Sequence, residues 1–322
     1  MQNLRQHYAY LDSAKAVAIL AVVLGHIASP FGNFLFAWHM PFFFLVGGFF
    51  IRTDTTFAEF TNKNLQRLGV PYVVFGAIGI AAEIAKRIAL SRPLGDLPDY
   101  PAGLLFWMDY SHMIGYHHIL WFLPALFGAR LMVWLVLRHV PQWWLAAPVV
   151  AALTTLGLLL PTQLPFALNQ ILQGVLWVWL GHEIFNRPAL RFSGQPYAWL
   201  GLCAVIVAIY VWLGVPSLNI ASSQFDAPLH NYVFSTAFSL ALILAMRLWA
   251  DSAGHVGSLL PWGENTLLIM IAHPYTNNIA HLVAEKWLMG AWYAKFAISL
   301  TLLYAILRVK LRWPDSVPLR YA

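Results

Sequence analysis

The chain has 322 residues, of which 60% are hydrophobic and only 10% are charged, and its mean hydropathy is +0.65. Soluble domains average about 45–50% apolar and about 25% charged residues, so this composition excludes a soluble protein. The single cysteine, Cys203, excludes an internal disulfide and a CxxC-type metal site, and we expect no metal.

Apolar runs recur along the whole chain, and each is long enough to cross a hydrocarbon layer about 30 Å thick. They lack the alternating segments of about ten residues that mark a membrane β-barrel. We therefore expect an all-α integral membrane protein with one transmembrane domain over residues 1–322. The predicted ten spans are residues 11–29, 34–51, 68–90, 117–137, 143–160, 166–185, 197–213, 229–249, 262–284 and 291–308.

Basic residues predict the orientation of these spans, because cytoplasmic loops carry an excess of Lys and Arg. With the N-terminus in the cytoplasm, twelve basic residues lie in cytoplasmic segments and five lie on the opposite side. The twelve are Arg5, Arg52, Lys63, Arg67, Arg138, Arg187, Arg191, Arg247, Arg308, Lys310, Arg312 and Arg320, and the five are Lys86, Arg87, Arg92, Lys286 and Lys295. We expect both termini in the cytoplasm, and the net charge of +6 needs no nucleic-acid partner.

The first span, in "LDSAKAVAILAVVLGHI", carries Asp12, Lys15 and His26. Eleven residues of α-helix leave about 20° beyond three full turns, so Lys15 and His26 lie on one face about 16 Å apart. Ionisable groups inside membranes are expensive, which favours an anion site at Lys15 and a proton-transfer group at His26. The alternative is that Lys15 snorkels to the interface and His26 only packs.

The second span, in "FLFAWHMPFFFLVGGFFIR", places His39 at a depth similar to that of His26. Pro41 would kink this helix, and a packing histidine is the alternative. Arg52, Lys63 and Arg67 follow in the next cytoplasmic segment, where a basic cluster suits phosphates but also fits ordinary topogenic charge.

Further candidates lie in the fourth and ninth spans. His118 and Trp121 of "YHHILWFLPALF" lie near the outer surface, where they would bind a substrate or simply anchor the helix. His273 lies in the middle of the ninth span, directly before Pro274. A third intramembrane histidine favours a shared polar cavity.

Five segments occur in a characteristic order: "LDSAKAVAILAVVLGHI", "FAWHMPFFFLVGGFF", "LGVPYVVF", "LWFLPALF" and "GENTLLIMIAHP". Together they resemble the acyltransferase 3 family of bacterial membrane acyltransferases, and most closely its fucose 4-O-acetylase-like branch. The resemblance covers nearly the whole chain. It implies a multi-pass protein of the bacterial inner membrane that uses cytoplasmic acetyl-CoA and acylates a cell-envelope glycan or a lipid-linked saccharide.

The resemblance also implies roles for individual residues. The family histidine regarded as catalytic corresponds to His26, and Lys15 stands where the family usually has Arg. The family's basic loop corresponds loosely to Lys63 and Arg67. We therefore expect His26 to be catalytic. His39, at a similar depth, is the second catalytic candidate, which orients the acceptor or His26. We expect donor phosphates at Lys15, Arg52, Lys63 and Arg67, and the acceptor at His118, Trp121 and His273.

A second class of function fits the same residues. Buried histidines also suit a proton-coupled transporter of polysaccharides or small molecules. The chain shows no clear inverted repeat of broken spans, which argues against transport. A purely structural membrane subunit does not explain three buried histidines.

Overall fold

The computed structural model describes residues 9–161, 164–186, 195–253, 257 and 259–314. The described chain is almost entirely helical, which confirms the all-α expectation. Ten helices have ten or more residues: α2 (Ala9–Gly25), α4 (His39–Gly48), α6 (Val70–Ala89), α8 (Phe122–His139), α9 (Trp143–Leu159), α10 (Leu168–Asn186), α11 (Pro196–Leu213), α12 (Pro228–Ala253), α14 (Thr266–Trp287) and α15 (Trp292–Arg312).

Shorter elements connect these helices. The short helical elements are α3 (Gly32–Phe36), α5 (Phe57–Asn64), η1 (Leu65–Gly69), α7 (Asp99–Ala102), η2 (Gly103–Trp107), η3 (Tyr116–Trp121), η4 (Pro165–Ala167) and α13 (Leu260–Glu264). Strands β1 (Leu218–Asn219) and β2 (Gln224–Phe225) form one antiparallel hairpin. In its register Leu218 lies opposite Phe225, and Asn219 lies opposite Gln224.

Membrane spanning is supported by helix length and composition. Four helical segments of the described chain are long and apolar enough to cross a membrane, namely Phe57–Ala89, Tyr116–His139, Pro196–Leu213 and Pro228–Ser252. Each of the ten predicted spans overlaps one of the helices. The count of ten spans and the location of the termini remain predictions.

The second predicted span is divided, and a single helix over residues 34–51 is wrong in this respect. The chain leaves helical geometry at Trp38, where φ is −138°, and α4 begins at His39. Pro41 is therefore in the first turn of α4, where its missing N–H costs no helical hydrogen bond. The break places His39 at the end of a helix.

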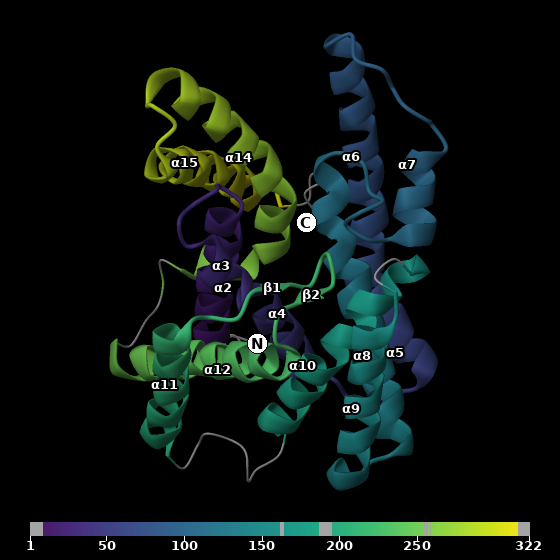
Figure 1. The fold of residues 1–322 in the computed structure, drawn as a ribbon, viewed down its shortest axis with the longest axis vertical. Coiled ribbons are helices and arrows are strands. Elements are labelled where there is room, and N and C mark those ends of the chain that lie inside the picture. The colour runs from purple at the N-terminus through teal and green to yellow at the C-terminus, as the bar shows by residue number, and fades with distance from the viewer. Residues whose placement is uncertain (1–8, 162–163, 187–194, 254–256, 258, 315–322) are drawn as a thin grey trace.

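The centre of the molecule is built from α2, α4 and α10. Helix α2 packs against α12, α13 and α14, and α4 packs against α10 and α12. In Figure 1, α6, α8 and α9 form one side of the molecule, and α11, α12, α14 and α15 form the other. Gly48 and Gly181 bring α4 and α10 into backbone contact. A Cβ at Gly48 would overlap the Val178 carbonyl, and one at Gly181 would overlap the Leu45 carbonyl.

Candidate active site

Three histidines from three helical elements lie close together in the structure. His26 directly follows the last residue of α2, His39 begins α4, and His273 lies within α14. The ring of His26 is 5.1 Å from that of His273 and 6.4 Å from that of His39, measured between centroids. The structure therefore brings the three histidine rings together, and their role as a shared polar site remains a prediction.

All three rings are oriented by the same type of hydrogen bond. Nδ1 of His26 lies 2.8 Å from the Val22 carbonyl, and Nδ1 of His39 lies 2.6 Å from the Leu35 carbonyl. Nδ1 of His273 is 3.3 Å from the carbonyl of Ile269. A carbonyl oxygen only accepts, so each Nδ1 carries the proton and donates it. In a neutral ring, Nε2 then has the free lone pair that a general base needs.

Two cavities meet at His26. The first, cavity A, has a volume of about 310 Å³, and the second, cavity B, has a volume of about 330 Å³. His26 lines both, and its side chain is exposed. His39 lines cavity A, and His273 lines cavity B. His26 is therefore the only one of the three histidines that both cavities share.

Cavity A is a mainly apolar space that reaches one basic residue. Ile19 and Val22, which lie on the α2 face between Lys15 and His26, line it. Arg67, from η1, lines the same cavity and is otherwise exposed. Such a space suits a long, thin, mostly apolar ligand with an anionic end.

Arg130 on α8 lies close to this end of cavity A, and sequence reasoning gave it no role. Its Nε donates to Asn64 at 2.7 Å, and its Nη1 donates to the Gly47 carbonyl. Arg130 and Arg67 interact electrostatically, and both are positively charged. Two neighbouring guanidinium groups favour an anion between them. The signal was present in the sequence, because an arginine inside an apolar span is a functional candidate.

The other predicted donor residues do not line cavity A. Lys15 forms an ion pair with Asp12 at 2.6 Å, one turn away on α2. Lys63 is exposed on α5. Among the four predicted phosphate ligands, the structure brings only Arg67 to the cavity.

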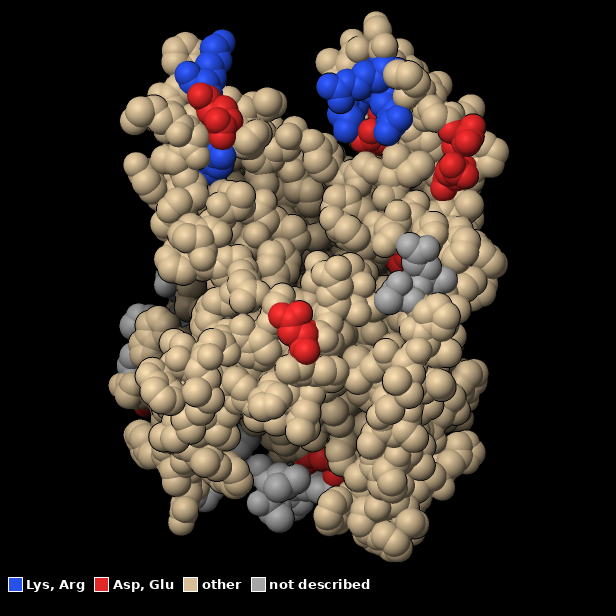
Figure 2. All heavy atoms as spheres, viewed as in Figure 1, with Lys and Arg blue, Asp and Glu red and all other residues tan. Residues whose placement is uncertain are grey.

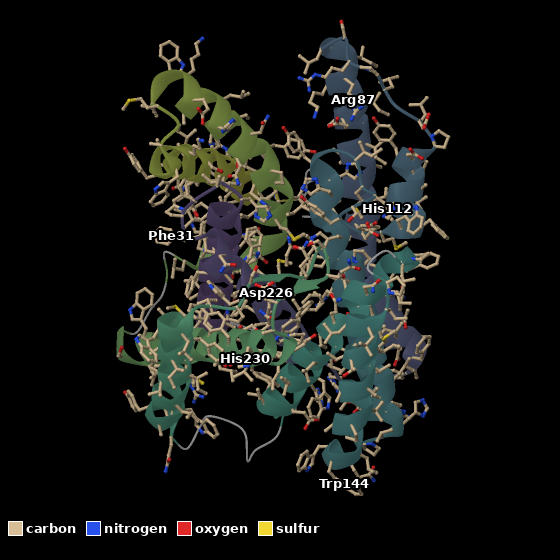
Figure 3. The ribbon with its side chains drawn as sticks, in the orientation of Figure 1. Phe31, Arg87, His112, Trp144, Asp226 and His230 are labelled. Atoms are coloured by element: carbon tan, nitrogen blue, oxygen red, sulfur yellow. The ribbon has the colours of Figure 1, made fainter. Side chains whose placement is uncertain are left out.

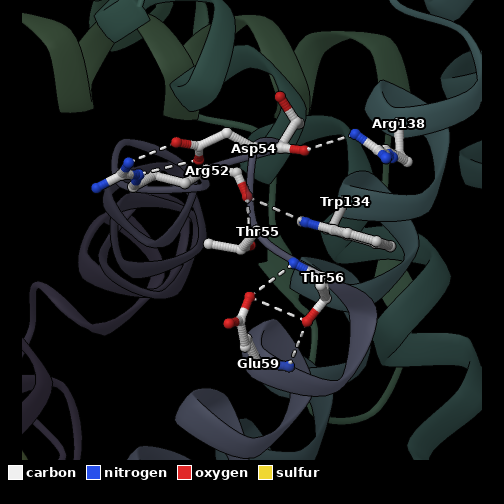
Figure 4. Close-up of polar contacts among 8 residues, drawn as sticks. Arg52, Asp54, Thr55, Thr56, Glu59, Trp134 and Arg138 are labelled. Atoms are coloured by element: carbon white, nitrogen blue, oxygen red, sulfur yellow. Dashed lines mark hydrogen bonds and ion pairs between the residues drawn. The ribbon is translucent and has the colours of Figure 1, made fainter.

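Arg52 belongs to a separate cluster of polar contacts in the turn before α5 (Figure 4). Its Nε and Nη2 donate to Asp54 at 3.0 and 2.5 Å. These bonds lower the pKa of the Asp54 carboxyl, so the pair stays charged at neutral pH. Thr56 caps α5 in a capping box with Glu59. Arg52 is thus engaged in ordering this turn.

The two residues predicted at the acceptor entrance, His118 and Trp121, line different cavities. His118 lines cavity B, where its Nδ1 donates to the Gly115 carbonyl at 2.6 Å. Trp121 lines cavity A. His273 joins His118 in cavity B.

A buried polar network holds the end of α2 next to the histidines. Ile27 N–H bonds to the carbonyl of Leu24, which leaves the Val23 carbonyl without its usual helical donor. The amide of Asn277 donates to Val23 at 3.1 Å, and Ser299 donates to Asn277 at 2.6 Å. This network joins α14 and α15 to the turn that carries His26.

The described residues include no group of three or more His, Cys, Asp or Glu side chains placed to hold a metal ion. Long apolar helices around a buried polar site define an integral membrane protein with its site between the helices. Residues 8–309 match the family model described as "Acyltransferase domain" (acyltransferase 3). The chain belongs to this family of membrane acyltransferases, which confirms the resemblance at the level of the family. No curated protein and no solved structure matches it.

Proposed function

We propose that this acyltransferase transfers acetyl from cytoplasmic acetyl-CoA to a sugar hydroxyl. The acceptor is a cell-envelope or exported polysaccharide, or its lipid-linked precursor, at the bacterial inner membrane. The observation that carries the proposal is that His26 lines both cavities. Two substrates that enter from different directions would then meet at one base. Assignment to the fucose 4-O-acetylase-like branch is part of this proposal.

Cavity A suits the donor. Its apolar walls fit the pantetheine arm, and Arg67 with Arg130 nearby supplies positive charge for the phosphates. Its volume of about 310 Å³ is small for a ligand pocket, so the nucleotide would lie outside, towards Lys63. In this arrangement the thioester reaches the histidines while the charged part of the donor stays near the surface.

Cavity B suits the acceptor. His26, which lines it, then acts as the general base. Its Nε2 takes the proton of the sugar hydroxyl while the hydroxyl oxygen attacks the thioester carbonyl carbon. The new C–O bond forms, the C–S bond breaks, and the proton passes from His26 to the thiolate sulfur. The Val22 carbonyl holds Nδ1–H throughout and stabilises the transient imidazolium. Transfer through an acetyl-histidine is the covalent variant of this step.

The decisive test is His26→Ala in the purified protein. General-base catalysis typically contributes about 10²–10⁴-fold, so kcat should fall by that factor. Acetyl-CoA binding should survive, because the proposed phosphate contacts lie at the other end of cavity A. The measurement is acetyl transfer to an isolated envelope glycan fraction, scored by mass spectrometry, beside an acetyl-CoA binding assay.

The matched control is His230→Ala, which removes an exposed histidine that contacts Tyr210. It should leave acetyl transfer unchanged. Near-normal turnover by folded His26→Ala would overturn the assignment and make His39 and then His273 the next candidates. A wild-type protein that does not bind acetyl-CoA would instead favour the transporter.

A further inference from the structure

Two groups of basic side chains flank a hollow at one end of the molecule. Figure 2 shows Lys and Arg gathered over the end of α6 and over the ends of α14 and α15, with the hollow between them. Residues from η3, α14 and α15 line cavity B, which places it between these groups. The acidic side chains of the connection to α7 lie on the far side of α6 from the hollow.

The α6 cluster consists of Lys86 and Arg87 around Glu83. Lys86 Nζ is 2.5 Å and Arg87 Nε is 2.9 Å from the Glu83 carboxylate. Two cations therefore share one anion, which leaves net positive charge. Lys86 also lies over the ring of Tyr116, 4.7 Å from its centroid, and Tyr116 lines cavity B. This contact connects the α6 cluster to the cavity.

The opposite wall carries a buried lysine. Lys295 on α15 is only 9% exposed, lines cavity B, and donates to Glu285 at 2.6 Å. Glu285 occupies one of its three N–H donors, so donors remain for a ligand. His281 and Lys286 lie beside Glu285 in α14, and His281 also lines cavity B. Burying a lysine is costly, which favours a binding role for it.

The cavity has a reactive end and a charged end. His273 and His281 both line it and are eight residues apart on α14, which corresponds to about 12 Å along the helix. His26 lies at the His273 end, and Lys295 contacts Glu285 near the His281 end. A ligand that fills cavity B would place a hydroxyl at His26 and another group at Lys295.

We propose that the acceptor is an anionic saccharide, whose phosphate or carboxylate binds between Lys295 and the α6 cluster while its hydroxyl reaches His26. This deepens the proposed function and rests on it for the identity of cavity B as the acceptor site. Two kinds of acceptor could supply the negative charge. One is the phosphate of a lipid-linked sugar, and the other is the carboxylate of a uronic acid.

The test is a titration of the full chain in nanodiscs of neutral phosphatidylcholine, followed by tryptophan fluorescence. The probes share one scaffold: cellobiose, cellobiouronic acid and cellobiose 1-phosphate. A charge-assisted contact should make one or both anionic probes bind at least about tenfold more tightly than cellobiose. Binding of the phosphate probe alone identifies a sugar phosphate, and binding of the carboxylate probe alone identifies a uronic acid.

In the Lys295→Gln variant, the affinity of the anionic probe should fall to that of cellobiose. Because that variant removes the Glu285 ion pair, the Lys86→Gln, Arg87→Gln double variant tests the opposite wall independently. Arg308→Gln is the control, because it removes one charge from α15 thirteen residues, or about 20 Å, from Lys295. Equal affinity for all three probes, or unchanged preference in both test variants, would overturn the proposal. The titration contains no acetyl-CoA, so its result does not depend on whether His26 catalyses transfer.

Discussion

At the scale of single residues, the site depends on how each histidine is held. A hydrogen bond from Nδ1 to a carbonyl four residues earlier fixes the tautomer and aims Nε2 away from the helix backbone. For His39 and His273, Nε2 is buried without a hydrogen-bond partner in the described chain. An unsatisfied buried acceptor is costly, and such groups persist where a substrate or a reaction uses them. The two unpaired Nε2 atoms therefore fit a site that binds a substrate or carries out a reaction.

Arg67 is expected to bind the donor phosphates more directly than Lys15. Arg67→Gln should raise the donor KM by about tenfold and change kcat little, because a phosphate contact exists in both the ground and transition states. Lys15→Gln is the matched comparison, since Lys15 pairs with Asp12 and does not line cavity A. Steady-state kinetics over a range of acetyl-CoA concentrations measure both. A larger KM effect for Lys15→Gln would restore Lys15 as the main phosphate ligand.

Residue-scale prediction from the sequence depended on depth in the membrane and on helical periodicity. The histidines were identifiable because ionisable groups are rare in apolar helices, and Ile19 and Val22 follow from helical geometry. Side-chain pairing was not identifiable, because the Asp12–Lys15 bond depends on rotamers. The place of Trp121 in cavity A also depends on how η3 turns into α8, which periodicity does not specify.

At the scale of helices, the points where helices begin and end position the histidines of the candidate site. The end of α2 at Gly25 and the start of α4 at His39 place two of the histidines at helix ends. Asn277 replaces a backbone donor at the first break, and Trp38 turns the chain at the second. Apolar runs predicted where helices lie, but the break between α3 and α4 falls inside one continuous apolar run. Hydrophobicity alone therefore could not reveal it.

The contact between α4 and α10 yields a stability prediction. Gly48→Ala places a methyl group against the Val178 carbonyl, which is backbone and moves only if α10 shifts. Overpacking of this kind typically costs about 1–3 kcal/mol, so the thermal unfolding midpoint should fall. Gly201→Ala on α11 is the control, because its added Cβ meets no atom within 4 Å. Equal midpoints for the two variants, measured by fluorescence in one detergent, would show that α4 and α10 are less tightly fitted.

At the scale of the whole molecule, the two cavities share His26, and His39 and His273 line one cavity each. Figure 2 shows Lys and Arg side chains on both sides of one hollow, over the end of α6 and over the ends of α14 and α15, which are distant in the sequence. Figure 3 labels Arg87 and Trp144 at opposite ends of the molecule, in segments predicted to face opposite sides of the membrane.

This arrangement makes topology the broadest test. We expect both termini in the cytoplasm, because twelve basic residues fall on that side against five on the other. Reporter fusions after residue 322 and near residue 141 should report the cytoplasm, and a fusion near residue 100 should report the opposite side. The fusion near residue 141 is the internal control, because the turn between α8 and α9 follows Arg138. If residues 100 and 322 report the same side, the predicted topology is wrong, and the proposed path from cytoplasmic acetyl-CoA to an external acceptor would be lost.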